Sequence, residues 1–277
     1  MKKINGKRPL FHVLALVIVA IFTVCLLSLP NSAMAAESIP KPAELSQNEK
    51  CAVPRGDVQI PYEGMKIKTV LCYGDSNTYG ADPNDAYGRH PWPIRWPGRL
   101  QTLLGPGYHV VEEGMSGRTT VFDDPLEPER NGSADLAGAL MTHSPVDIVI
   151  LALGINDCKT HFHATPIVIA KGVERLCRII KTGGGHRQKH PPLVVIVSPV
   201  HALEGVERSY VMFGPESVQL SQQLAPYFRE IAEKQKALFL DAETVAHASP
   251  ADCLHMDRES HLALAEALAR IIKSLND

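Results

Sequence analysis

The stretch KTVLCYGDSNTYG, residues 68–80, decides how the rest of the chain is interpreted. It starts with an apolar run typical of a buried strand and continues into Gly74-Asp75-Ser76. Glycine relaxes the backbone where a strand turns sharply, and aspartate or serine often caps the helix that follows. The stretch therefore predicts a strand-to-helix turn. Ser76 is then either part of a helix cap or a nucleophile held at the carboxyl end of the strand.

Further apolar runs follow this turn at regular intervals. With the first run, IKTVLCYG, the strand candidates are YHVVEEG (108–114), DIVILALG (147–154), LVVIVSP (193–199) and ALFLDAE (237–243). Three of the five are nearly continuous in apolar residues, as strands buried on both faces of a parallel sheet are. Helical patterns lie between or after them, at 96–104, 166–182, 217–235 and 258–275. This alternation predicts an α/β fold, a doubly wound parallel sheet of about five strands with helices on both faces.

Residues 1–35 have the three parts of a secretory signal peptide. Basic MKKINGKRP precedes the apolar run LFHVLALVIVAIFTVCLLSL, and NSAMA follows with small Ala33 and Ala35 where a signal peptidase prefers them. We expect cleavage after Ala35, which would make the mature protein periplasmic or secreted. The alternative is an uncleaved membrane anchor, because the apolar run is almost long enough to span a bilayer.

The remaining chain has the composition of a globular protein. Residues 36–64 are polar and rich in proline, which predicts a linker or a surface arm, and residues 65–277 then form the folded domain. The formal net charge is −2, and removing residues 1–35, which carry four basic side chains and no acid, would change it to −6. Such a charge gives no attraction to a phosphate backbone, so we expect no nucleic-acid partner.

Cysteine and histidine spacing gives little support for a metal or redox site. Five cysteines follow residue 35, none in C-x-x-C spacing, and the odd number leaves at least one thiol unpaired. A disulfide between Cys158 and Cys253 stays open as an alternative. His161 and His163 could form a ligand pair, but no third ligand pattern lies nearby, so we expect no metal, no cofactor and a loop at the rim of a site.

Four polar stretches fall where open α/β sheets form their sites, near the carboxyl ends of strands. They are GDSN (74–77), EEGMSGRTT (112–120), GIND (154–157) and, before the last helix, DCLH (252–255). Taken singly, each has an ordinary explanation as a turn or a cap. Together they supply a hydroxyl, an imidazole, a carboxylate and N–H donors, which is a working set for acyl transfer.

Acyl transfer assigns a role to each of these groups. Ser76 needs a base to become a nucleophile. His255 would accept its proton, and Asp252 would hold the imidazole in the correct tautomer. The backbone N–H groups of Ser76 and Gly117 and the side-chain amide of Asn156 would form the oxyanion hole.

Aromatic side chains near these motifs are candidates to bind the substrate, with core packing as the alternative. They are Tyr79, Trp92, Trp96 and Phe122. The carboxylate pair Asp123-Asp124 is expected to lie in a loop and not to act as a general acid and base.

At this point the chain resembles the SGNH (GDSL-type) hydrolases. GDSN, the glycine of MSGRTT, GIND and DCLH match the four blocks of that family in order, over about residues 66–275. VLCYGDSNTYG, VVEEGMSGRTTVFDDP and LGINDCKTHFHATP are similar to its arylesterase and acyltransferase branch. The resemblance implies a flavodoxin-like sheet, the same triad and oxyanion hole, and a structural Asp75. It also implies hydrolysis of short-chain and aryl esters, with acyltransferase or perhydrolase activity and large oligomers in some members.

Two positions depart from the family pattern. Cys253 stands where glycine is frequent, and Met256 stands where leucine or phenylalanine is frequent. Both are neighbours of the expected triad, so they affect substrate fit more than mechanism. The alternatives are a carbohydrate acetylesterase of the same fold and a non-catalytic periplasmic binding protein. An ordinary α/β-hydrolase would need a G-x-S-x-G elbow, which the sequence lacks.

Overall fold

A parallel sheet of five strands organises the chain in the computed structural model, which describes residues 66–182, 188 and 190–275. The predicted signal peptide and Pro-rich arm lie outside the described residues. The strand order is β2-β1-β3-β4-β5, and every neighbouring pair is parallel. The strands are β1 (Lys68–Gly74), β2 (Tyr108–Gly114), β3 (Ile148–Ala152), β4 (Leu193–Ser198) and β5 (Leu238–Asp241). The prediction of a parallel sheet from the apolar runs is confirmed.

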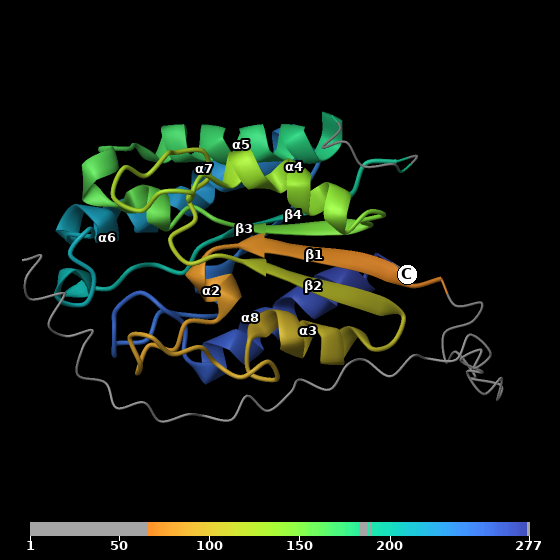
Figure 1. Cartoon of the computed structure of the whole chain (residues 1–277), viewed down its shortest axis with the longest axis horizontal. Coiled ribbons are helices and arrows are strands. Elements are labelled where there is room, and N and C mark those ends of the chain that lie inside the picture. Colours follow the sequence, from red (N-terminus) through yellow and green to blue (C-terminus); the bar gives the residue numbers. More distant parts are fainter. Residues whose placement is uncertain (1–65, 183–187, 189, 276–277) are drawn as a thin grey trace, which may run out of the picture. The chain divides into compact units, whose positions relative to one another are not determined.

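Helices cover both faces of the sheet (Figure 1). One face carries α4 (Gly132–Thr142), α5 (Pro166–Thr182) and α7 (Leu224–Lys234). The other carries α3 (Trp96–Leu104) and α8 (Arg258–Lys273). Two short helices, α2 (Ser76–Tyr79) and α6 (Pro215–Gln222), lie in the loops after β1 and β4. The doubly wound arrangement is therefore confirmed as well.

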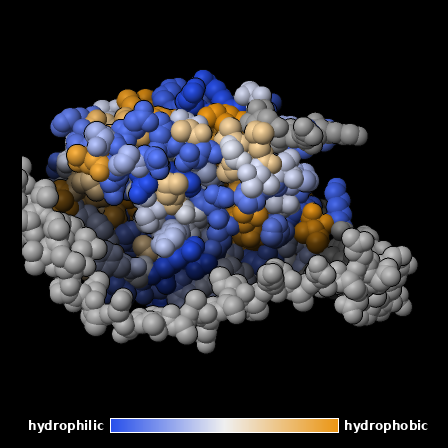
Figure 2. All heavy atoms as spheres, in the orientation of Figure 1, coloured by the Kyte–Doolittle hydropathy of each residue, from blue (hydrophilic) through white to orange (hydrophobic). Residues whose placement is uncertain are grey.

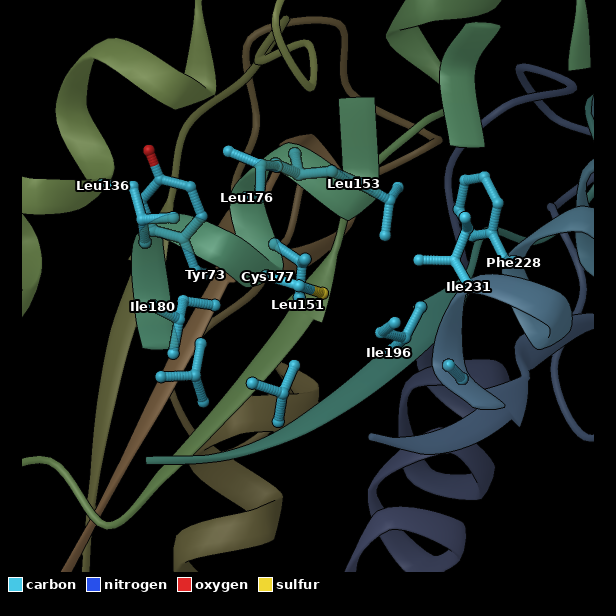
Figure 3. Packing of buried hydrophobic residues seen from close by; sticks show 14 of the residues in the cluster. Tyr73, Leu136, Leu151, Leu153, Leu176, Cys177, Ile180, Ile196, Phe228 and Ile231 are labelled. Atoms are coloured by element: carbon cyan, nitrogen blue, oxygen red, sulfur yellow. The ribbon is translucent and has the colours of Figure 1, made fainter. Parts of the chain in front are cut away.

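Strand β1 shows why two helix layers are needed. Its side chains alternate between the faces, so Leu71 and Tyr73 enter the cluster under α4, α5 and α7, while Val70 and Cys72 enter the cluster under α3 and α8. All four side chains are fully buried. Figure 3 shows the first cluster, where side chains of α4, α5 and α7 close over the sheet. A strand that is apolar on both sides requires helices on both sides.

Two helices differ from the sequence prediction. The single helix expected over 217–235 is two helices, α6 and α7, which meet at Gln223. Helix α4 has no counterpart among the predicted elements, because its sequence GSADLAGALMT contains two glycines and buries only Gly132, Leu136 and Leu140. Its start is fixed by Asn131, whose side chain accepts a hydrogen bond from the backbone N–H of Ser133 at 2.9 Å.

Figure 2 shows the hydropathy of the residues on one face of the molecule. Hydrophilic residues predominate there, and hydrophobic residues are scattered between them. Among the described residues, no helix combines the length and the apolar character needed to cross a membrane.

Candidate active site

The carboxyl ends of β1 and β3 lie side by side in the middle of the sheet. This is the point where the strand order reverses, since β2 lies on one side of β1 and all later strands lie on the other. Ligand sites of open α/β sheets form at such a point. Ser76 follows β1 here and Asn156 follows β3, as the spacing predicts.

In the turn after β1, the residue that caps α2 is not Ser76. The capping residue is Asp75, whose side chain accepts from the backbone N–H of Asn77 at 2.9 Å. Ser76 is the first residue of α2. Glycine is required at 74, because a Cβ there would lie 2.0 Å from Thr78 Oγ1 and 2.8 Å from the carbonyl oxygen of Ala152. Burial raises the pKa of Asp75 to about 6, against the opposing effect of the Asn77 N–H.

A continuous chain of hydrogen bonds starts at Ser76. Its Oγ lies 2.8 Å from His255 Nε2, and His255 Nδ1 lies 2.6 Å from Asp252 Oδ2. The other oxygen of Asp252 accepts from the backbone N–H groups of Leu254 at 3.0 Å and His255 at 2.9 Å. Burial alone would raise the pKa of Asp252, but the hydrogen bonds and charge of His255 outweigh it and hold the pKa below its usual value. A carboxylate that stays ionised can orient the imidazole as a base.

Asn77 connects the turn that carries Ser76 to the loop that carries His255. Its Oδ1 accepts from the backbone N–H of Met256 at 2.9 Å, and its Nδ2 donates to the carbonyl of Leu254 at 3.4 Å. These bonds tie the turn after β1 to the loop that carries His255. The sequence motif GDSN contains Asn77, but no role for it follows from the residues alone, because its partners are backbone groups 177 and 179 positions away.

The three predicted oxyanion donors line one cavity. Ser76, Gly117 and Asn156 border a cavity of about 490 Å³ that also exposes His255. Gly117 has φ +82°, a left-handed conformation that favours glycine. Asn156 is nearly buried, and its Nδ2 donates to the carbonyl of Arg118 at 3.2 Å. That bond aligns the amide while its second N–H remains available for a ligand.

Replacing Asn156 by alanine is expected to lower kcat for an acetate ester by about a hundredfold with a small change in KM, because a side-chain donor to the oxyanion acts in the transition state. Steady-state kinetics of the variant beside the parent protein measure this. A thermal melt of both proteins controls for the lost bond to Arg118. A kcat within threefold of the parent would remove Asn156 from the predicted oxyanion hole.

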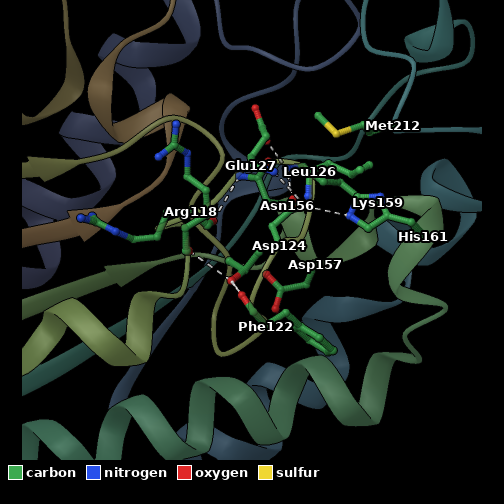
Figure 4. Close-up of polar contacts among 12 residues, drawn as sticks. Arg118, Phe122, Asp124, Leu126, Glu127, Asn156, Asp157, Lys159, His161 and Met212 are labelled. Carbon is green, nitrogen blue, oxygen red and sulfur yellow. Dashed lines mark hydrogen bonds and ion pairs between the residues drawn. The ribbon is translucent and has the colours of Figure 1, made fainter. Parts of the chain in front are cut away.

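A buried group of ion pairs holds the loop that follows Asn156 (Figure 4). Lys159 is 2% exposed, and its Nζ contacts Asp124 at 2.8 Å and also pairs with Glu127. His161 Nε2 lies 3.2 Å from the other oxygen of Asp124. Burial raises the pKa of Asp124 by itself, but Lys159 and nearby backbone N–H groups lower it below the usual value.

Asp157 anchors the same loop from within. It accepts from the backbone N–H of Thr120 at 3.0 Å and from the Thr120 hydroxyl, and it is fully buried. Burial raises the pKa of Asp157 to about 7 despite the hydrogen bonds from Thr120. The Asp of the GIND motif is therefore structural, and it holds the segment of Gly117 against the segment of Asn156.

The predicted aromatic pocket is only partly right. Tyr79 lines the cavity around Ser76. Trp96 is 1% exposed in the core beneath α3 and α8, and Phe122 packs on Phe162 with ring centroids 5.0 Å apart. Neither of them borders that cavity, and neither does Trp92; Trp96 takes the core position that was the alternative. The sequence does not show that α3 turns the Trp96 side chain inward to the sheet.

Side chains that the sequence prediction omits line the cavity instead. They come from the loop after α2, from the loop before α4 and from the loop between β4 and α6. The principal ones are Asp82, Asp85, Tyr87, Arg130, Tyr210, Met212 and Phe213. No motif marks these residues, because the loops that carry them have no periodic pattern and reach the site only through the fold.

Cys158 and Cys253 are both free thiols in the described part of the chain. Cys158 is buried, and its Sγ lies 3.6 Å from the carbonyl of Gly154. Cys253 has φ +65°, in the left-handed region. Glycine is frequent at this position of the family because it adopts the left-handed conformation without strain, whereas Cys253 is strained there.

Replacing Cys253 by glycine is expected to stabilise the protein by about 1 kcal/mol. In a domain of this size that corresponds to a rise in Tm of about 2–4 °C. Calorimetry of the glycine and alanine variants measures the effect. Alanine keeps a Cβ and should show no gain, so an equal gain in both variants would contradict the backbone explanation.

Comparisons with known proteins agree with this geometry. A model of the GDSL-like lipase/acylhydrolase family matches residues 72–263. An acetylxylan esterase of Xylanibacter ruminicola is 24% identical over 232 residues, which are 77% of this chain and 45% of that protein. The chain therefore spans about half the length of this curated relative.

Two solved structures are more similar in sequence. Est24, a carbohydrate acetylesterase from Sinorhizobium meliloti, is 36% identical with a TM-score of 0.70, covering 75% of this chain and 99% of that one. The aryl esterase of M. smegmatis is 36% identical with a TM-score of 0.71 and the same coverage, 75% and 99%.

Proposed function

This chain belongs to the GDSL-like lipase/acylhydrolase family, and we propose that it is a serine esterase that cleaves short-chain carboxylic esters. The observation that carries the proposal is the hydrogen-bonded chain from Ser76 through His255 to Asp252. It opens into the same cavity as Gly117 and Asn156. A nucleophile, a base, an orienting carboxylate and oxyanion donors on one cavity are what acyl transfer from an ester requires.

The mechanism follows from these contacts. His255 Nε2 takes the proton of Ser76 Oγ as the oxygen attacks the ester carbonyl. The tetrahedral oxyanion is bound by the N–H groups of Ser76 and Gly117 and by the amide of Asn156. His255 then protonates the leaving alcohol, which leaves an acyl group on Ser76. Water activated by His255 releases the acid, and an alcohol or peroxide in place of water gives acyl transfer or perhydrolysis.

The test of the function is turnover of p-nitrophenyl acetate by the purified protein, with labelling by a fluorophosphonate. We expect release of nitrophenolate and a mass increase confined to the peptide that contains Ser76. Acetate, butyrate and octanoate esters then measure the preferred chain length. Turnover without labelling at Ser76 would reject this site, and a protein inert toward every ester would favour the non-catalytic binding protein.

A second candidate, a carbohydrate acetylesterase, is favoured by the walls of the cavity. Asp82, Asp85, Glu127 and Arg130 all border it. Charged groups of both signs hydrogen-bond well to a hydroxylated leaving group and poorly to an aryl ring. The similar Est24 is named as a carbohydrate acetylesterase. Comparing kcat/KM for phenyl acetate and for acetylated xylo-oligosaccharides separates the two, since the sugar ester should be preferred only if these side chains contact the leaving group.

Export and assembly belong to the same proposal. The N-terminal signal pattern supports a periplasmic or secreted protein cleaved after Ala35, and N-terminal sequencing of the protein from each cell fraction tests it. Oligomers in the resembling branch support a homo-oligomer, which light scattering tests. The substrate is then a small ester that meets the mature protein outside the cytoplasm.

A further inference from the structure

Tyr210 contacts both partners of Ser76 at once. Its hydroxyl lies 3.1 Å from Asp252 Oδ2 and 3.1 Å from His255 Nδ1. Its ring stands edge-on to the imidazole of His255, with centroids 5.4 Å apart and planes at 86°. Tyr210 comes from the loop between β4 and α6, 42 residues from Asp252, so the contact exists only in the folded protein.

The chemistry of the three groups fixes the direction of these bonds. An ionised carboxylate only accepts hydrogen bonds, so the Tyr210 hydroxyl donates to Asp252 Oδ2. His255 Nε2 must be unprotonated to accept from Ser76, so Nδ1 carries the imidazole proton and donates to the same oxygen. Asp252 Oδ2 thus accepts from both His255 and Tyr210.

The geometry points to Tyr210 as a positioning residue of the proposed esterase reaction. It holds the carboxylate of Asp252 against the imidazole, and it shares the negative charge that stabilises protonated His255. A carboxylate with an additional donor stabilises the imidazolium less. Tyr210 therefore sets both the orientation of His255 and the pH at which this base becomes protonated. This inference rests on the proposed function, and the experiment below separates the two.

The surroundings keep the phenol protonated and in place. Its backbone N–H bonds to the carbonyl of Val206 at 2.9 Å, and its ring packs beside Phe213 and Leu254. Burial and the charge of Asp252 both raise the pKa of Tyr210 well above its usual value. The hydroxyl consequently remains a donor over the pH range of the experiment described below.

Two other titratable groups act on His255 from neighbouring elements. Asp75 caps α2 and has a pKa raised to about 6 by burial. His261 lies in α8 and has a pKa lowered to about 3, first by burial. Neither Asp75 nor His261 contacts the Tyr210 hydroxyl, so their effect on His255 should be the same with and without that hydroxyl. A difference between the two proteins therefore reports the hydroxyl.

The experiment is the pH profile of kcat/KM for phenyl acetate, between about pH 5 and 9, for the parent protein and Tyr210→Phe. The pH profile of kcat/KM reports the pKa of the base in the free enzyme. The position of its acidic limb therefore does not depend on how the aromatic ring of residue 210 contacts the substrate. We expect the acidic limb of the variant to move to higher pH by about half a unit to one unit, because Asp252 then stabilises protonated His255 more strongly. The plateau of kcat should fall several-fold because the carboxylate is less firmly held.

Two further proteins sharpen the test. Tyr227→Phe removes a phenol hydroxyl from α7, outside the cavity, and should leave the limb in place. Replacing Tyr210 with 3-fluorotyrosine makes the hydroxyl a stronger donor and keeps the ring, so the limb should move slightly to lower pH. This protein also serves if Tyr210→Phe folds poorly.

The outcomes are distinct for the two proposals. An inactive parent protein rejects the esterase function. An active parent whose acidic limb stays within about 0.2 pH units in both Tyr210 proteins rejects the positioning role, whatever happens to their stability. Opposite shifts in the two proteins establish the role.

Discussion

Replacing Ser76 by alanine is expected to lower kcat/KM for p-nitrophenyl acetate by about a thousandfold or more. The reason is that Ser76 Oγ is the hydroxyl within hydrogen-bond distance of His255 Nε2, at 2.8 Å, and it faces the cavity that holds the oxyanion donors. Alanine keeps the first turn of α2 and the cap by Asp75. The loss should therefore be catalytic, with a Tm close to that of the parent protein.

His255 provides the internal control for this result. A triad acts as a unit, so His255→Ala alone should cost about as much as Ser76→Ala, and the double variant should lose little more. Ser133→Ala, on α4 and away from the cavity, should retain the parent rate. Losses that multiply in the double variant, or a Ser76→Ala protein as active as the parent, would show that the two side chains do not act together.

Replacing Lys159 by methionine is expected to destabilise the protein by about 3–5 kcal/mol. Methionine fills a similar volume, but it leaves the carboxylate of Asp124 without its cation at a position where the Asp124 side chain is 0% exposed. An uncompensated buried charge is far more costly than a lost surface ion pair. Urea denaturation followed by fluorescence measures the free energy of unfolding.

Lys171 offers a matched control for that measurement. It forms a salt bridge of similar length, 2.9 Å, to Glu174, but its side chain is 54% exposed. Lys171→Met should therefore cost less than about 1 kcal/mol. The double variant Lys159→Met with Asp124→Asn should recover part of the loss, because it removes the stranded charge. Equal effects of the two single lysine variants would contradict the burial argument.

The sheet and the principal site motifs could be predicted from the sequence because they depend on local signals. A run such as Val70–Tyr73 is apolar on both faces, which leaves a parallel interior strand as the natural solution. Ser76, Asn156 and His255 follow recognisable motifs, and a parallel sheet brings the ends of its strands to one edge. Their meeting in one cavity follows from topology.

The rest of the site depends on contacts that no local pattern encodes. Tyr210 reaches Asp252 through an irregular loop, and Asn77 binds backbone groups whose positions only the fold determines. Trp96 lies in the core, and its neighbourhood in sequence gives no information on which way α3 faces. Helix α4 has only a weak periodic signal in the sequence, because it contains two glycines and short apolar side chains, and its packing on the sheet overrides that weakness.

His255 lies 179 positions after Ser76, so the two residues are also synthesised at different times. A ribosome that adds about 5–20 residues per second places the base in the chain about 10–40 seconds after the nucleophile. Throughout that interval Ser76 has no partner to accept its proton, and the loop of Leu254 and Met256 that Asn77 binds does not yet exist. A growing chain thus carries an inert serine, and the ability to attack esters arrives only after residues 252–255 have been added.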